Sequence, residues 1–212
     1  FFMGGFQGFL GWFMVRSGLI DNPGVSHFRL ALHLTFALIT FAYTLWVALD
    51  LIYPNKTQVI VPLRNLARIS FVFLILQIIY GGFVAGLNAG LIHNHWPLMS
   101  DGQLIHDSVF IEKSTLFLNL IEGKSGVQFV HRIMAYVVVG LILALYFNSK
   151  KYSLTSLQKK GINVLVLIVF LQFTLGVFTL LFRVPLSLGL LHQVVAFFLL
   201  TAMTFTLHRF SK

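Results

Sequence analysis

The stretch QFVHRIMAYVVVGLILALYF, residues 128–147, decides the class of fold of this chain. Its twenty residues include a single side chain that is charged at neutral pH, Arg132. An α-helix of this length is about 30 Å long, which is the thickness of the hydrocarbon core of a bilayer. The stretch therefore predicts a transmembrane helix.

Five further windows of similar length are equally apolar, roughly residues 1–20, 30–49, 66–88, 162–182 and 186–207. The 212 residues are 58% hydrophobic and 10% charged, whereas a soluble domain carries about 25% charged residues. The mean hydropathy is +0.88. We therefore expect an all-α integral membrane protein with six transmembrane helices in this chain. The alternating pattern of β-barrel strands is absent from the sequence.

The composition also excludes several classes of protein. A chain without cysteine cannot be a disulfide scaffold, hold a metal through thiolates or use a cysteine nucleophile. The net charge of +9 does not indicate a nucleic-acid-binding protein, because the basic residues lie between apolar runs and not in one patch. Such dispersed basic residues are typical of membrane topology signals.

The connections between the windows alternate between two sides of the membrane. One side, with the C-terminus, carries one acid, Asp50, and nine basic residues, Lys56, Arg64, Arg68, Lys150, Lys151, Lys159, Lys160, Arg209 and Lys212. The opposite side carries six basic residues. By the positive-inside rule, both ends of this chain face the cytoplasm, preferably across a bacterial inner membrane, with a mitochondrial inner membrane left open. The chain opens at Phe1 within an apolar stretch, and we expect its natural start to lie upstream.

A two-helix unit occurs three times along the chain. In each unit a helix with a Gln-x3-Gly pattern precedes a helix with a His-x3-Ala pattern, and residues four apart share one helix face. The three units contain Gln7, Gly11, His33 and Ala37; Gln77, Gly81, His131 and Ala135; and Gln172, Gly176, His192 and Ala196. The alanine leaves room beside each histidine for a flat, bulky group, and the Gln-x3-Gly pairs are interpreted mainly as helix packing.

An apolar four-helix bundle with histidines from two helices is a standard haem site. The last four windows supply such a bundle, with His131 and His192 as axial ligands of one haem iron. The first two windows supply half of a second bundle, with His33 unpaired. A lone membrane histidine more often packs helices or relays protons, but relays generally use carboxylates and none lies within the windows. A zinc site would need a tight tetrahedral cluster, so the repeat favours haem.

The other polar residues carry weaker signals. The long outer connection, residues 89–127, contains Val109–Leu120, which is expected to form an interfacial helix. Arg29 and Arg132 lie at the outer ends of histidine helices, where they either pair with haem propionates or anchor the helices at the interface. Three histidines of the long connection are low-probability metal ligands, His93, His95 and His106. His27 is expected to be solvated, and His208 to snorkel beside Arg209.

The sequence resembles the heme A synthase family over essentially the whole chain. The stretches that carry the resemblance are GWFMVRSGL (11–19), VSHFRLALHL (25–34), AGLNAG (85–90), NHWPLM (94–99), QFVHR (128–132) and GLLHQ (189–193). They are closest to the mitochondrial and related bacterial branch of the family.

The resemblance implies eight transmembrane helices in two pseudo-symmetric four-helix bundles. Residues 1–50 would form the second half of the catalytic N-terminal bundle, 51–65 a cytoplasmic connection, and 66–212 the C-terminal bundle with its long outer loop 89–127. The C-terminal bundle would hold haem b between His131 and His192. His33 matches the fourth-helix histidine of the catalytic bundle, whose partner histidine and nearby glutamate belong to two helices that this chain lacks.

The resemblance also implies the activity, which is oxidation of the ring methyl of haem O to the formyl group of haem A for cytochrome oxidase biogenesis. The bis-histidine haem b would relay electrons to an unknown acceptor. Delivery of haem O by a haem O synthase and a homo-oligomeric state are left open, and no nucleic acid is expected. The alternatives are a non-enzymatic membrane cytochrome b, which explains His131 and His192 equally well, and a small-solute transporter with a histidine relay.

Overall fold

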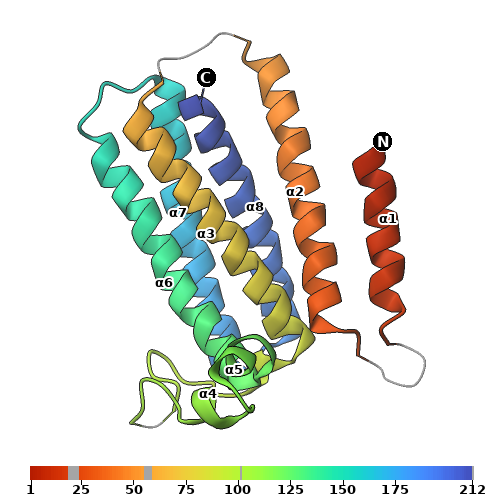
Figure 1. Ribbon diagram of the computed structural model, residues 1–212. Coiled ribbons are helices and arrows are strands. Elements are labelled where there is room, and N and C mark those ends of the chain that lie inside the picture. Colours follow the sequence, from red (N-terminus) through yellow and green to blue (C-terminus); the bar gives the residue numbers. More distant parts are fainter. Residues whose placement is uncertain (19–23, 55–58, 101, 212) are drawn as a thin grey trace.

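The computed structural model describes residues 1–18, 24–54, 59–100 and 102–211, and the regular structure in these ranges is helical (Figure 1). An isolated bridge between Ser100 and Gln103 is the exception among the described residues. The helices are α1 (Phe2–Val15), α2 (His27–Ile52), α3 (Val61–Gly86), the 3-10 helix η1 (Ala89–Leu91), α4 (Ser108–Ile111), α5 (Leu116–Glu122), α6 (Lys124–Ser149), α7 (Ser156–Leu181) and α8 (Leu186–Ser211).

Five of these helices, α2, α3, α6, α7 and α8, are long and apolar enough to cross a membrane. Each has 26 residues and is about 39 Å long at 1.5 Å per residue, so its ends extend beyond the hydrocarbon core. The expectation of an all-α integral membrane protein is confirmed. The helix in the first window, residues 1–20, is shorter than predicted. Helix α1 has 14 residues and ends before the charged Arg16. Residues 19–23, which include the last two residues of the predicted window 1–20, lie outside the described ranges.

The long helices also extend past the predicted windows, α2 and α6 at both ends, α3 and α7 at their starts and α8 at its end. The connection predicted at 51–65 is shorter in the structure, because α2 continues to Ile52 and α3 begins at Val61. Helix α3 has a proline in its first turn. Proline is favoured there because the first backbone N–H groups of a helix have no intrahelical acceptor. The windows were shorter because polar residues such as Arg64 lower hydropathy without ending the helix.

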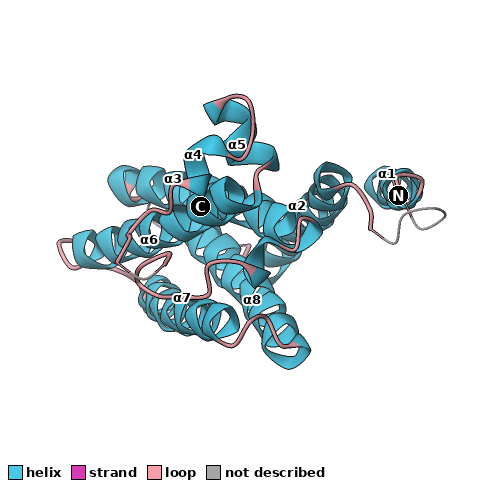
Figure 2. Cartoon of the chain, turned by 90° about the horizontal axis from the view of Figure 1, so that it is seen from below, coloured by secondary structure: helices cyan, strands magenta, loops and turns pink. Residues whose placement is uncertain are grey.

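Helices α3, α6, α7 and α8 form a four-helix bundle. Helix α3 packs against α6 and α8, and α7 packs against the same two, so α6 and α8 occupy opposite corners (Figure 2). Helix α2 lies against α3 and α8 outside this bundle, and α1 packs against α2. The C-terminus lies at one end of the molecule and the N-terminus in the half toward it, whereas the long connection with α4 and α5 lies at the opposite end, here called the loop end (Figure 1).

The tightly packed core of the bundle lies in the half that faces the termini. Its fully buried members include Ile142 of α6, Leu165 of α7 and Leu200 of α8. Among the buried residues of this core, none belongs to α6 before Val138 or to α8 before Leu199. The contiguous buried core of the bundle is therefore concentrated in the half that faces the termini.

Two glycines of α3 let α2 approach closely. A Cβ atom at Gly82 would lie 2.9 Å from the Ala31 Cβ, and one at Gly86 would lie 2.6 Å from the His27 Cβ and 2.7 Å from its Cα. Spaced four residues apart, the glycines share one face of α3, as in other close contacts between transmembrane helices. The pair thereby fixes α2 against the four-helix bundle.

We predict that Gly86→Leu separates α2 from α3 and destabilises the protein by about 1–3 kcal/mol or more, because the backbone of His27 cannot yield to a side chain. Thermal unfolding in detergent measures the effect as a lower midpoint. Gly140→Leu is the matched control, since a Cβ at Gly140 of α6 has no atom within 4 Å. Equal unfolding midpoints for both variants would contradict the role of Gly86.

A polar contact joins α2 and α8 at the end that carries the C-terminus. The His208 side chain is 0% exposed, and its Nε2 lies 2.7 Å from an Asp50 carboxylate oxygen. The His208 ring also packs edge-on against Trp46. The prediction that His208 snorkels beside Arg209 is wrong, because the side chain turns inward to the carboxylate of a helix 158 residues away in sequence.

The long connection folds into two short helices where one was predicted. Within Val109–Leu120, the chain breaks between α4 and α5 because the Asn119 side chain takes over the local hydrogen bonds. Its amide nitrogen donates to the carbonyls of Phe110 and Thr115, and its Oδ1 accepts from the Lys113 N–H. A second anchor is Glu112, whose carboxylate accepts the first N–H groups of α6 at 3.0 Å each.

Candidate functional site

Each of the three predicted histidines lies against the glycine of its own repeat unit. A Cβ atom built on the glycine would lie 3.0 to 3.4 Å from the histidine Cε1, closer than almost all real Cβ contacts. The pairs are Gly11 with His33, Gly81 with His131, and Gly176 with His192. The absence of a side chain at these positions therefore gives each imidazole its place.

The glutamine of each unit contacts the same imidazole. The Gln77 Nε2 lies 3.4 Å from the His131 Nε2, and the Gln172 Nε2 lies 3.2 Å from the His192 Nε2. In the first unit, the Gln7 Nε2 lies 3.1 Å from the His33 Nδ1 and 3.4 Å from its Nε2, and it donates to the His33 carbonyl at 3.2 Å. The glutamines thus do more than pack helices, contrary to the sequence interpretation.

His131 and His192 share one four-helix bundle, on the opposite helices α6 and α8. They lie in its loop-end half, outside the tight core. Both Nδ1 atoms are buried without a hydrogen-bond partner among the described residues. Two histidines backed by glycines, on opposite helices of an apolar bundle, fit a flat macrocycle whose iron would take one nitrogen from each ring.

His33 lies outside that bundle, on α2, and its contacts come from α1. The α1–α2 pair repeats the geometry found in α3–α6 and α7–α8. The described part of the chain therefore contains one two-histidine site and one half-site of the same design.

Comparison with known proteins identifies the family. Residues 1–204 match the family described as Cytochrome oxidase assembly protein. The chain is 75% identical over 211 residues to the heme A synthase of Flavobacterium johnsoniae and 71% identical over 210 residues to that of Flavobacterium psychrophilum, covering 99% of this chain in each case. It is 41% identical over 199 residues to the heme A synthase of Wolbachia pipientis wMel, covering 92% of this chain.

The chain belongs to the heme A synthase family. It spans 62% of the length of each Flavobacterium relative and 54% of the Wolbachia relative. The resemblance drawn from the sequence motifs is thereby confirmed. The assignments of His33, His131 and His192 to haem iron stay predictions.

Arg29 and Arg132 were predicted either to pair with haem propionates or to anchor their helices at the interface. In this member of the heme A synthase family, both side chains donate hydrogen bonds to backbone carbonyls. Arg29 donates to the Phe13 carbonyl at 2.9 Å and lies over the Phe13 ring, so it connects α2 to the end of α1. Arg132 donates to the carbonyls of His93 and Leu98 and so holds the long connection onto α6. The described contacts are those of anchors. The Arg132 Nε is buried and has no hydrogen-bond partner among the described residues.

His27 differs from its prediction as well. It is the first residue of α2 and half-buried, where it was expected to be a solvated loop residue. Its Nε2 lies 3.1 Å from the Ile121 carbonyl, and its ring packs against Phe83. No sequence motif indicates this contact, because Ile121 is 94 residues away.

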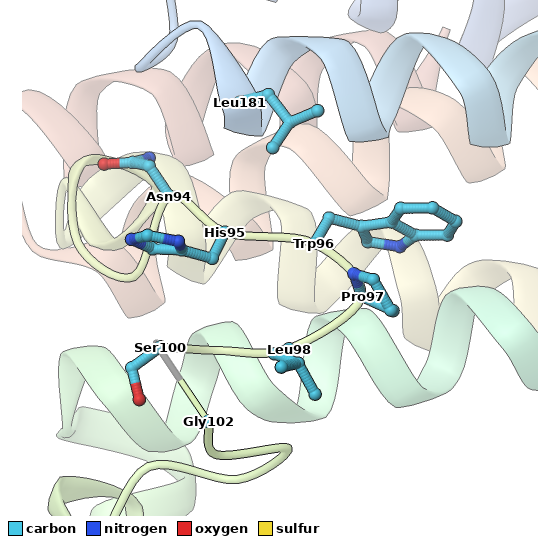
Figure 3. A pocket seen from close by; sticks show the side chains of 8 residues that line it. All are labelled: Asn94, His95, Trp96, Pro97, Leu98, Ser100, Gly102 and Leu181. Carbon is cyan, nitrogen blue, oxygen red and sulfur yellow. The ribbon is translucent and has the colours of Figure 1, made fainter.

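The three histidines of the long connection lie at two different sites: His95 lines a pocket, and His93 and His106 lie together in a hydrogen-bonded cluster. The described residues contain no group of three His, Cys, Asp or Glu side chains placed to hold a metal ion. His95 lines an open pocket of about 330 Å³ beneath the loop, together with Trp96 and with Leu181 of α7 (Figure 3). The Trp96 indole N–H donates to the Tyr136 hydroxyl at 2.9 Å, which fastens this pocket to α6.

His93 and His106 instead join a chain of hydroxyl groups. The His93 Nε2 lies 3.0 Å from the Ser125 hydroxyl, and the Ser108 hydroxyl connects Ser125 at 2.7 Å to the His106 Nδ1 at 2.7 Å. Burial lowers the pKa of His93, and electrostatic interaction with His106 and Arg132 lowers it further. The neutral form of His93 is therefore the one that the folded loop holds.

We predict that acid loosens the long connection. A detached His93 keeps its ordinary pKa of 6.5, above its pKa in the folded loop, so the detached state binds protons more readily as the pH falls below about 6.5. Stability is thus full above that pH and declines below it. Hydrogen exchange of residues 104–111, corrected for intrinsic rates, should be faster at pH 5.5 than at pH 7.5. His93→Gln should remove this pH dependence, and an unaltered dependence in that variant would contradict the assignment.

Proposed function

We propose that the protein is a heme A synthase that oxidises the ring methyl of haem O to the formyl group of haem A, with a bis-histidine haem b as electron relay. The observation that carries the proposal is the threefold Gln–Gly–His contact, of which two copies share the α3–α6–α7–α8 bundle. The curated relatives named heme A synthase support it.

In this proposal His131 and His192 hold haem b, each through one ring nitrogen. Haem iron with both axial positions filled by protein supplies electron transfer and does not bind oxygen. The glycines opposite the rings keep the imidazoles in one orientation, and the apolar side chains of α3, α6, α7 and α8 exclude water. Haem b held in this bundle would supply electron transfer for the catalytic half.

His33 positions the substrate in the other half of the molecule. Its ring is held by Gln7 and Gly11 of α1, and it would bind the iron of haem O. Side chains alone cannot oxidise an unactivated methyl, so the part of the chain is to bind and orient the macrocycle. The orientation that we propose places both ends of this chain at the cytoplasmic face, which puts all three histidines toward the outer leaflet. Basic residues gathered at the end with the C-terminus support it.

Extraction of pigments from the protein expressed from its natural gene tests the proposal. Chromatography and mass spectrometry should find haem b together with haem O, haem A or a hydroxylated intermediate. Haem b alone would instead support a non-enzymatic membrane cytochrome b. A protein without any haem would overturn the assignment of all three histidines.

A further inference from the structure

The glutamine contacts determine which nitrogen of each imidazole carries the proton. An amide NH₂ group only donates hydrogen bonds, so the ring nitrogen that it contacts must accept one. In His131 and His192 that nitrogen is Nε2. The ring proton consequently lies on Nδ1, and the Nε2 lone pair is directed at the amide N–H. A metal ion needs this arrangement when it binds a histidine through Nε2.

Each glutamine–histidine pair also contains an unmade hydrogen bond. The Nδ1 atoms of His131 and His192 are buried donors without a partner in the described part of the chain, and the Oε1 atoms of Gln77 and Gln172 are buried acceptors without one. A buried polar group left unpaired destabilises the fold because it has lost its hydrogen bonds to water. Donor and acceptor of the right kinds therefore lie within one contact and are not yet joined.

The first unit shows that a glutamine at this position reaches both ring nitrogens. The Gln7 Nε2 is 3.1 Å from the His33 Nδ1 and 3.4 Å from its Nε2. Rotation of an amide by half a turn about its last bond exchanges its nitrogen and oxygen. The same side chain can thus donate to one ring nitrogen in one state and accept from the other ring nitrogen in a second state.

We propose that Gln77 and Gln172 are positioning residues for the two haem ligands, an inference that rests on the proposed function. Before haem binds, each amide N–H occupies the Nε2 lone pair of its histidine and so fixes the tautomer and the ring against the glycine. With haem iron bound at that nitrogen, the amide oxygen would be available to accept the Nδ1–H. A hydrogen bond from Nδ1–H raises the basicity of a histidine ligand and favours the more oxidised metal.

The spacing of the repeat fits this role better than packing alone. Gln77 precedes Gly81, and Gln172 precedes Gly176, by four residues, which is about one helical turn. The glycine supports the Cε1 edge of the ring, while the glutamine one turn away meets the nitrogen. An apolar side chain such as leucine would fill the same volume, but it could neither set the tautomer nor accept the Nδ1–H.

The test compares Gln77→Leu and Gln172→Leu in the protein expressed from its natural gene, with haem b content and the reduction potential of haem b as readouts. Each variant should retain haem b about 10–100-fold less tightly, as for other partners of ligating histidines. The haem b that remains should have a higher reduction potential, since its ligand has lost an acceptor. Gln193→Leu is the matched control, because Gln193 is exposed on α8 beside His192 and should change neither readout.

Gln77→Glu separates the two roles and serves if a leucine variant does not accumulate. An ionised carboxylate accepts the Nδ1–H but cannot donate to Nε2, so this variant should keep haem b at a lower reduction potential than the unsubstituted protein. The inference would be overturned if the variants had the same haem b content and the same haem b reduction potential as the unsubstituted protein. If the unsubstituted protein itself lacks haem b, the proposed function fails, and the two failures are thereby distinguished.

Discussion

His131→Ala and His192→Ala are each expected to abolish the low-spin haem b spectrum of the protein. The two histidines lie on opposite helices of one bundle and would supply both axial nitrogens, so loss of either leaves one side of the iron without a ligand. No other histidine of the described bundle helices stands in a Gln–Gly contact of this kind. Reduced-minus-oxidised difference spectra of purified protein measure the effect, with haem content determined per mole of protein.

A matched histidine outside the bundle controls for nonspecific loss. His95→Ala removes an imidazole from the pocket beneath the long connection and should leave the haem b spectrum unchanged. An unaltered reduced spectrum in either His131→Ala or His192→Ala would refute the axial assignment. Loss of the spectrum in all three variants would indicate a general folding defect, which the thermal unfolding midpoint would reveal.

The class of fold and the grouping of the histidines could be predicted because both depend on local sequence. Windows of apolar residues locate the spans, and one histidine in each of three windows, at corresponding depth, indicates a repeated site. The ends of the helices were less predictable. Hydropathy continues past Arg16, where α1 has already ended, and falls at Arg64, where α3 has already begun.

Contacts between distant segments could not be predicted from spacing. His208 looked like an interfacial residue because its neighbour is Arg209, but the side chain that decides its position is Asp50, on another helix. The break inside Val109–Leu120 depends in the same way on the fold of the whole loop around Asn119. Such contacts require the packing of the helices, which the sequence pattern does not specify.

The role of the glutamines could be predicted only in part. Their spacing from the glycines was visible in the sequence, and Gln77 and Gln172 were correctly placed beside helix interfaces. Which atom each amide meets depends on the register of the neighbouring helix, so that the choice between packing and ligand positioning required coordinates.

His33→Ala is expected to leave haem b in place and to reduce conversion of haem O about 100-fold or more. His33 belongs to the α1–α2 unit, outside the bundle that holds His131 and His192, so haem b should not depend on it. Conversion depends on the position of the ring methyl, and a displacement of about 1 Å in an active site costs about 100-fold in rate. The measurement is the ratio of haem A to haem O in membranes that contain the protein expressed from its natural gene.

The two readouts together decide what His33 does. Leu34→Ala is the control, because Leu34 is an exposed neighbour on the same helix and should not affect either haem. Equal conversion in His33→Ala and in the unsubstituted protein would make His33 a packing residue of the Gln7–Gly11 contact. Loss of haem b together with conversion would contradict the separation of the two halves, because only a His33 that supports the four-helix bundle could remove both. Retained haem b with lost conversion assigns the α1–α2 half to the substrate and the α3–α6–α7–α8 bundle to the relay.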